Sequence, residues 1–345
     1  MNNTHRLVLV LAAAALVAGA PARTAWAAAD PGGLAAWDGD QQQTERFSKT
    51  VPLPKGGSLD LSNIAGDIVI TGGAGDQVVI DAVKRGKTTE DLKLVEIEVT
   101  TTATRVEVRT QYPRERRNTS VSVDFTVTVP RAAGVTVRSV SGDLKVVTVD
   151  GVLAAETVSG EVAITQAARL ESAKSVSGGL VIDTAGSEGD LSVSSVSGDV
   201  RLKAVKARGL DASSVSGGVE LAGVDTGRLR VKSVSGDLVF GGPLAKGGRY
   251  VLQAHSGDVT VYTDGKTGFE LKAGTFSGEI VSDLKITSPF GGEPPADAPP
   301  GRHAGRGPGQ KVSGTFGDGG VLLELSTFSG DVKIVNKAAT KAVKK

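Results

Sequence analysis

The chain has 345 residues, a formal net charge of +1 and no cysteine. Acids and bases are interspersed, which excludes the basic surface that nucleic-acid binding requires, and the lack of cysteine excludes disulfides, thiol chemistry and a lipidated-cysteine anchor. The 46 glycines, the aromatic content of 4% and the many Val and Thr residues are typical of an all-β protein with many turns.

The N-terminal residues have the features of a secretory signal peptide. Arg6 precedes an apolar run from Leu7 to Ala20, and Ala25 to Ala27 has the small-x-small form of a cleavage site. The run is shorter than the roughly twenty residues that a membrane span needs. We predict a signal peptide over 1–27, cleaved after Ala27, a linker over 28–46, and a secreted or periplasmic mature chain without a transmembrane segment.

Residues 47–137 contain long strands with alternating apolar residues. Leu94–Thr100 and Thr104–Thr110 predict a hairpin with charged residues of opposite sign on its wet side. Its apolar face would carry Val95, Ile97, Val99, Val106 and Val108. A further strand, Val121–Val129, ends at Pro130. We expect this region to cap the open edge of the repetitive strands that come after it in the chain.

The sequence SVSGDL at Ser139–Leu144 recurs along the chain. Its glycine repeats at intervals of 18 to 21 residues, at Gly142, Gly160, Gly178, Gly198, Gly217, Gly236, Gly257 and Gly278, with related units centred on Gly66 and Gly330. Apolar residues stand five and seven positions before each glycine and two and four after it. This pattern predicts two short strands per coil with one face inward. In one coil Leu170 and Glu171 indicate a one-residue bulge.

A single coil cannot fold alone. Four buried aliphatic side chains contribute about 6 to 12 kcal/mol, whereas ordering nineteen residues costs roughly 28 kcal/mol. We therefore predict a β-solenoid over 138–336 of about ten stacked coils with a period near 19 residues. A Pro/Gly-rich loop over 288–313 interrupts it, and a Lys-rich tail follows over 337–345. The loop's Arg302, His303, Arg306 and Lys311 form a candidate partner-binding surface.

The segment Val121–Val146, the serial SVSGD units and the terminal Gly314–Ile334 resemble the bacterial putative-adhesin family of β-strand repeat proteins, also called toastrack domains. The resemblance covers Leu59 to Ile334. It implies an extracytoplasmic β-solenoid, in some cases associated with envelope-stress systems, with no established enzymatic activity. It transfers no catalytic or ligand residues. The long Pro/Gly insertion departs from the family's common pattern.

The repeat itself has a structural explanation. The glycines are assigned as structural turn residues, because a sharp corner favours a positive φ or a close backbone approach. We expect the Ser before each glycine and the acid after it to bond backbone N–H groups in the turn. The acids would form a column, Asp67, Asp143, Glu161, Asp199, Asp237, Asp258, Glu279 and Asp331. Calcium binding by this column is a weaker alternative, because there is only one acid per coil.

No catalytic, cofactor or metal residues are assigned. His255 replaces the valine found two positions before the glycine in other coils, and we interpret it as a packing residue rather than a partner of Ser256 in catalysis. A polysaccharide-active enzyme using acids and bases such as Asp199 and Arg201, and an ice-binding solenoid, remain alternatives. The sequence favours a non-enzymatic, adhesin-like structural or binding module at the cell envelope. Its partner would be an unknown envelope protein or surface glycan.

Overall fold

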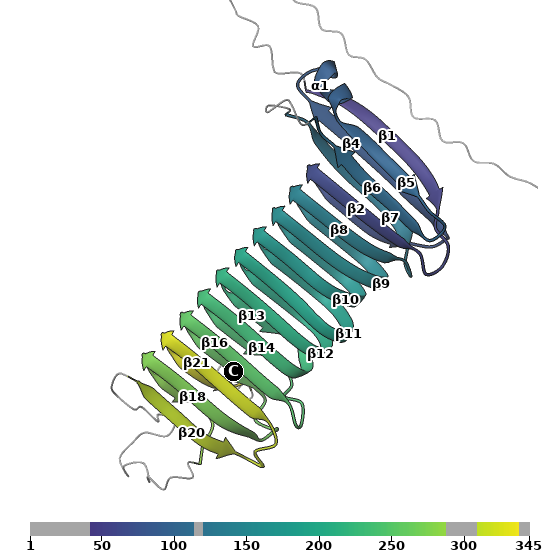
Figure 1. The fold of residues 1–345 in the computed structure, drawn as a ribbon. Helices are drawn as coiled ribbons and strands as arrows, with labels where there is room; N and C mark the ends of the chain where they lie inside the picture. The colour runs from purple at the N-terminus through teal and green to yellow at the C-terminus, as the bar shows by residue number, and fades with distance from the viewer. Residues whose placement is uncertain (1–41, 114–119, 288–308, 338–345) are drawn as a thin grey trace, which may run out of the picture. The chain divides into compact units, whose positions relative to one another are not determined.

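A computed structural model describes residues 42–113, 120–287 and 309–337, and the fold is a β-solenoid (Figure 1). One short helix and four flanking strands lie near the N-terminal end. Their bounds are β1 Gln43–Pro52, β4 Gln77–Gly86, α1 Thr89–Leu94, β5 Glu96–Thr101 and β6 Arg105–Gln111. Helix α1 was not predicted; the side chain of Thr88 caps it by accepting a hydrogen bond from the Asp91 amide.

The coils are built from strands that pair in parallel with their neighbours. Their bounds are β2 Ser58–Ala65, β3 Ile68–Gly73, β7 Ser122–Pro130, β8 Gly134–Ser141, β9 Leu144–Ser159, β10 Val162–Ser177, β11 Leu180–Ser197, β12 Val200–Ser216, β13 Val219–Ala222, β14 Asp225–Ser235, β15 Leu238–Gly241, β16 Arg249–Ser256, β17 Val259–Thr263, β18 Phe269–Ser277, β19 Ile280–Ser282, β21 Leu322–Ser329 and β22 Val332–Asn336. In each coil from β9 to β12, one long strand forms both sides of the coil. Its first half pairs with the first half of the neighbouring long strand, and its second half pairs with the second half.

The predicted inward positions are correct. In the coil of Gly198, Leu191 and Val193 before the glycine and Val200 and Leu202 after it are all 1% exposed or less. The corresponding residues of the other coils are buried in the same way and form one continuous core. The predicted bulge is also confirmed, because the pairing register of β10 shifts around Leu170. Stacking therefore supplies the burial that a single coil lacks.

At the N-terminal end the spatial order of the coils differs from the sequence order. Strands β2 and β3 lie between β6 and β7 on one side and β8 and β9 on the other (Figure 1). The predicted hairpin of β5 and β6 is confirmed, and β1, β4 and β7 pair antiparallel beyond the parallel coils. The region 47–137 therefore contains regular coils as well as a cap, and β1 begins inside the predicted linker.

The C-terminal end shows the same kind of rearrangement. Strands β21 and β22, which come last in the sequence, lie between the coil of β16 and β17 and the coil of β18 and β19 (Figure 1). Strand β20, Gln310–Phe316, pairs antiparallel with the open edge of β18. Residues 310–313, placed in the loop by the sequence, are thus strand, because pairing with β18 satisfies their backbone groups.

Within the described residues, no helix is long and apolar enough to cross a membrane.

Candidate binding surface

The glycine corner of each coil is held by close backbone stacking. At Gly198 φ is +158°, and a Cβ there would lie 2.3 Å from the carbonyl oxygen of Gly178 in the preceding coil. The amide of Gly198 donates to Ser216 O of the next coil at 3.0 Å. The other nine predicted turn glycines, Gly66, Gly142, Gly160, Gly178, Gly217, Gly236, Gly257, Gly278 and Gly330, also have positive φ. A side chain at this corner would separate the coils.

The hydroxyls that support this corner are not the predicted ones. The Ser directly before each glycine is exposed, as at Ser197 and Ser216. The buried hydroxyl stands three positions before the glycine: Ser195 and Ser214 donate at 3.0 Å to the carbonyl oxygens of Gly178 and Gly198 in the preceding coils. Side chains alternate between the two faces of the strand, so position minus three points inward like positions minus five and minus seven. Position minus one lies at the bend.

Where an aspartate follows the glycine, its carboxylate accepts from a backbone N–H group, but in the next coil rather than in its own turn. Asp199 Oδ1 accepts from the amide of Gly218 at 3.0 Å, and Asp143 Oδ1 accepts from Glu161 at 2.8 Å. The chain of bonds runs from Asp258 to Asp331 and then to Glu279, following the spatial order of the coils. Among the described residues, no group of three or more His, Cys, Asp or Glu side chains could hold a metal ion.

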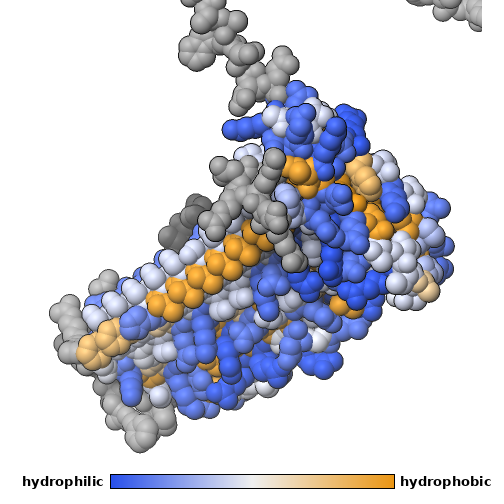
Figure 2. Space-filling view, turned by 45° about the horizontal axis from the view of Figure 1, so that its top comes forward, coloured by the Kyte–Doolittle hydropathy of each residue, from blue (hydrophilic) through white to orange (hydrophobic). Residues whose placement is uncertain are grey.

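An uninterrupted line of exposed side chains runs along this corner, two positions before each glycine (Figure 2). We call it the apolar row; in spatial order it consists of Ile64, Val140, Val158, Val176, Val196, Val215, Val234, His255, Phe328 and Phe276. Its apolar members are 41% to 50% exposed. Single exposed apolar residues are ordinary in soluble proteins, but a contiguous patch of several hundred Å² marks an interaction site.

The row ends in a stack of three aromatic rings. Phe328 lies between His255, at 5.1 Å between ring centroids, and Phe276, at 4.8 Å. Both pairs are nearly parallel, at 11° and 3°. The expectation that His255 packs in the structural column is thus revised: its ring contacts Phe328, but the column faces solvent. The alternation of side chains along the strand explains this exposure, because positions minus two and minus four point outward.

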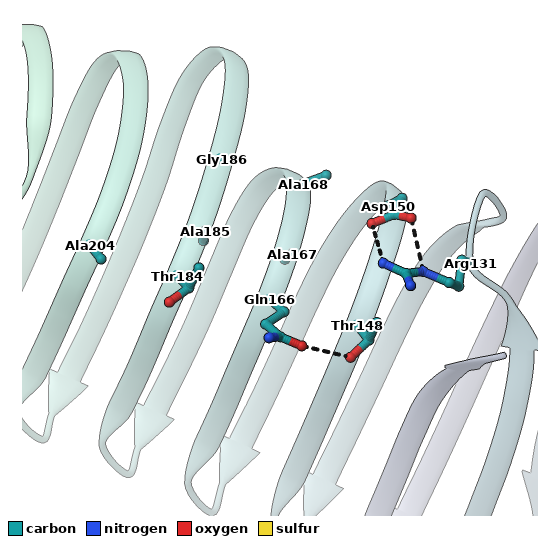
Figure 3. Close-up of a pocket in the computed structure, with 10 residues that line it drawn as sticks. All are labelled: Arg131, Thr148, Asp150, Gln166, Ala167, Ala168, Thr184, Ala185, Gly186 and Ala204. Carbon is teal, nitrogen blue, oxygen red and sulfur yellow. Dashed lines mark hydrogen bonds and ion pairs between the residues drawn. The ribbon is translucent and has the colours of Figure 1, made fainter.

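The corner of the coil opposite the glycines is different. Thr148, Gln166, Thr184 and Ala204 have φ between 51° and 60°, and they line a shallow depression of about 520 Å³ (Figure 3). The contacts there are polar and also join neighbouring coils: Thr148 Oγ1 donates to Gln166 Oε1 of the next coil at 3.0 Å. The positive φ thus repeats over successive coils, but the residue type does not, in contrast to the glycine corner.

The candidate enzymatic pair, Asp199 and Arg201, forms an exposed ion pair at 2.6 Å beside a small depression of about 160 Å³. Lys311 of the candidate partner-binding loop is an exposed residue of β20. The loop's Arg302, His303 and Arg306 lie outside the described residues, as do the predicted signal peptide and most of the tail.

Among the ionisable groups with shifted pKa values, Asp258 and Lys333 lie near one end of the array and Tyr112 near the other. The hydrogen bond from Lys333 to Asp258, 2.6 Å from Nζ to Oδ2, lowers the pKa of Asp258 and raises that of Lys333. Near the N-terminal end, burial raises the pKa of Tyr112 to about 12. Tyr112 donates to the carbonyl of Val121 at 3.0 Å. These shifts report structural contacts, since neither site adjoins a nucleophile with a base.

The apolar row could have been found in the sequence. Residues at minus seven and minus five are inward, so a valine at minus two has the opposite parity and must face outward. Six successive coils place valine there. Valine also suits a β-strand on a solvated face, which is why its repetition was interpreted as structural. The stacking of Phe328 between His255 and Phe276 could not be predicted, because it depends on the rearranged order of the last coils.

Comparisons with known proteins found one family model and several solved structures. The solved structures matched include a putative adhesin from Bacteroides fragilis NCTC 9343, 13% identical over 84% of this chain and 97% of that one with a TM-score of 0.42, and a putative lipid binding protein from Parabacteroides distasonis ATCC 8503, 8% identical over 84% and 96% with a TM-score of 0.47. A putative adhesin from the latter organism is 12% identical over 84% and 97%, with a TM-score of 0.40. No curated protein matches the sequence. The family Toastrack DUF4097 matches residues 57–290, and since this is well over half of the chain, the chain belongs to that family.

Proposed function

We propose that the protein is an extracytoplasmic, non-enzymatic, adhesin-like module that binds at the cell envelope through the apolar row. The row is the observation that carries this proposal. It keeps the same outward position over ten successive coils, and its apolar members are about half exposed. Completing the burial of each would contribute roughly 1 kcal/mol. A soluble domain that leaves so regular a line uncovered gains that energy only when a partner covers it.

The rigidity of the corner supports a binding role. The backbone beside the row is fixed by hydrogen bonds between coils. The donors are backbone amides and buried hydroxyls, and the acceptors are backbone carbonyls and carboxylates. Side chains on such a scaffold are ordered before binding, which lowers the conformational entropy lost on association. In the described part of the chain, neither His255 nor Asp199 lies in an arrangement of nucleophile, base and orienting acid. Sequence features at Arg6 to Ala27 support an extracytoplasmic location.

Beads coated with the purified protein test the binding role. They should retain envelope fragments from cells that express the chain, whereas a Val176→Ser, Val196→Ser double variant should reduce retention at least fivefold. The matched control is Gln166→Ser with Thr184→Ser at the opposite corner, which should retain as much as the unchanged protein. Equal retention by both variants would contradict a role for the row. N-terminal sequencing of the exported protein, expected to begin at Ala28, tests the location.

A further inference from the structure

We infer that the partner of the apolar row is a second copy of the same chain, aligned in parallel so that each coil faces its equivalent. The inference rests on the proposed function only in taking the row as a binding surface. The first argument is spacing. Neighbouring coils are strands of a parallel ladder, so successive side chains of the row repeat about every 4.8 Å. A surface with this repeat along its whole length is matched best by another with the same repeat.

Identical side chains at this spacing can interdigitate into a dry interface, as they do where paired β-sheets meet in steric zippers. Each copy would contribute ten side chains, nine of them apolar and about half exposed. The apolar surface covered is on the order of several hundred Å² per copy, in the range of a specific interface when the flanking residues are added. The valines are β-branched and lose little rotamer entropy when they are covered.

Charges on the two flanks of the row decide the direction. One flank is the acidic column after the glycines, which includes Asp143 and Asp237. The other flank, four positions before the glycines, carries Arg138, Lys174 and Lys232, with Glu156 as its one acid. These side chains are exposed. The row therefore has an acidic edge and a second edge with three bases and one acid among uncharged residues, where Arg138 also pairs with Asp60 and Glu156 of its own chain.

A twofold axis parallel to the array places the acidic edge of one copy opposite the basic edge of the other. Arg138 then faces Asp143 of the second copy, and Lys232 faces Asp237, since equivalent coils lie side by side. A twofold axis across the array instead places acidic edge against acidic edge, and like charges in contact oppose association. The charge pattern thus selects the parallel arrangement.

The absence of native cysteine allows a direct test by disulfide formation. Val140→Cys and Phe328→Cys lie near opposite ends of the row. If copies align in parallel, each variant alone forms a covalent dimer under mild oxidation. Thr184→Cys, exposed on the opposite corner, should remain monomeric and is the matched control. If covalent dimers form only when the two variants are mixed, the copies are antiparallel and the parallel assignment is wrong.

Sedimentation equilibrium of the cysteine-free protein gives the second readout. We expect a concentration-dependent dimer whose dissociation constant rises at least tenfold in Val196→Asp and is unchanged in Thr184→Asp. Circular dichroism should show both variants folded, because both positions are exposed. A protein that stays monomeric and forms no covalent dimer refutes self-association. If the beads still retain envelope fragments in that case, the proposed function stands with a different partner; if they do not, both fail.

Discussion

The glycine corner and the opposite corner both turn the chain within each coil, but they are built from different residues. At the glycine corner every coil repeats a glycine with positive φ, and in many coils the amide, the buried hydroxyl or the carboxylate bonds a neighbouring coil. At the opposite corner residues of three kinds, Thr, Gln and Ala, occupy a positive φ, and the side-chain bond between Thr148 and Gln166 joins two of the coils. The glycine corner fixes the stacking of the coils, and the opposite corner accommodates changes in coil length.

At the glycine corner, we expect steric crowding by a Cβ to reduce stability more than the positive φ does. Gly198→Ala places a Cβ against the backbone of Gly178 and should lower the free energy of unfolding by at least about 3 kcal/mol. Gly75, with a φ of +118°, has open space around it, so Gly75→Ala should cost only about 1 kcal/mol. Gly189→Ala has neither feature and is the control. Denaturation followed by circular dichroism measures all three. Equal losses at Gly198 and Gly75 would contradict the crowding argument.

The buried hydroxyls provide a smaller effect at the same corner. Ser214→Ala leaves the carbonyl of Gly198 without its side-chain donor and should cost about 1 to 2 kcal/mol. Ser216→Ala removes an exposed hydroxyl of the same strand and should change stability by less than about 0.5 kcal/mol. The pair distinguishes the observed position of the hydroxyl from the one expected from the sequence. If Ser216→Ala were the more costly variant, the assignment would be reversed.

A pH dependence should appear where the corner's carboxylates meet a lysine. The pKa of Asp258 lies below its ordinary value of 3.8 because Lys333 donates to it, so its stabilisation is present above that value and is lost as the pH falls through the lowered pKa. The pKa of Lys333 is raised, so its contribution is lost only at strongly alkaline pH. Both side chains are more than a third exposed, which limits the effect to about 1 kcal/mol or less.

Comparing Asp258→Asn with the unchanged protein isolates that contribution. The asparagine oxygen can still accept from the Asp331 amide, so the variant removes mainly the charge. We expect the difference in unfolding free energy to be largest near neutral pH and to shrink below pH 4. A difference that stays constant from pH 7 to pH 3 would show that the ion pair does not contribute.

The sequence predicted the regular coils well because their information is local and repeated. Period-two alternation around each glycine located the inward residues, and the shift at Leu170 marked the bulge. The order of the coils at the two ends could not be predicted in this way. The coil of Gly330 pairs with those of Gly257 and Gly278, and nothing in its own residues distinguishes it from a coil that simply follows in sequence.

The valines of the apolar row can be located in the sequence, but the sequence alone favours a packing role for them. Valine at position minus two can be explained by strand propensity or by recognition of a partner. Its exposure in an unbroken row favours recognition. The buried hydroxyl at minus three was missed for a related reason. The repeated sequence contains two serines, and turn propensity favours the one beside the glycine. In both cases the parity of the strand, counted from the inward residues, gives the right answer.

At the opposite corner a glycine should be tolerated and even favourable. Ala204 has a φ of 51°, which costs a residue with a Cβ about 1 kcal/mol, and Gly223 occupies the equivalent position of the next coil with a φ of 66°. Ala204→Gly relieves the strain but gains freedom in the unfolded chain, so we expect a net stabilisation of a few tenths of a kcal/mol. Ala168→Gly, at the same corner without a positive φ, should lose about 0.5 to 1 kcal/mol. Opposite signs for the two variants would show that this corner is limited by backbone conformation, whereas the glycine corner is limited by space.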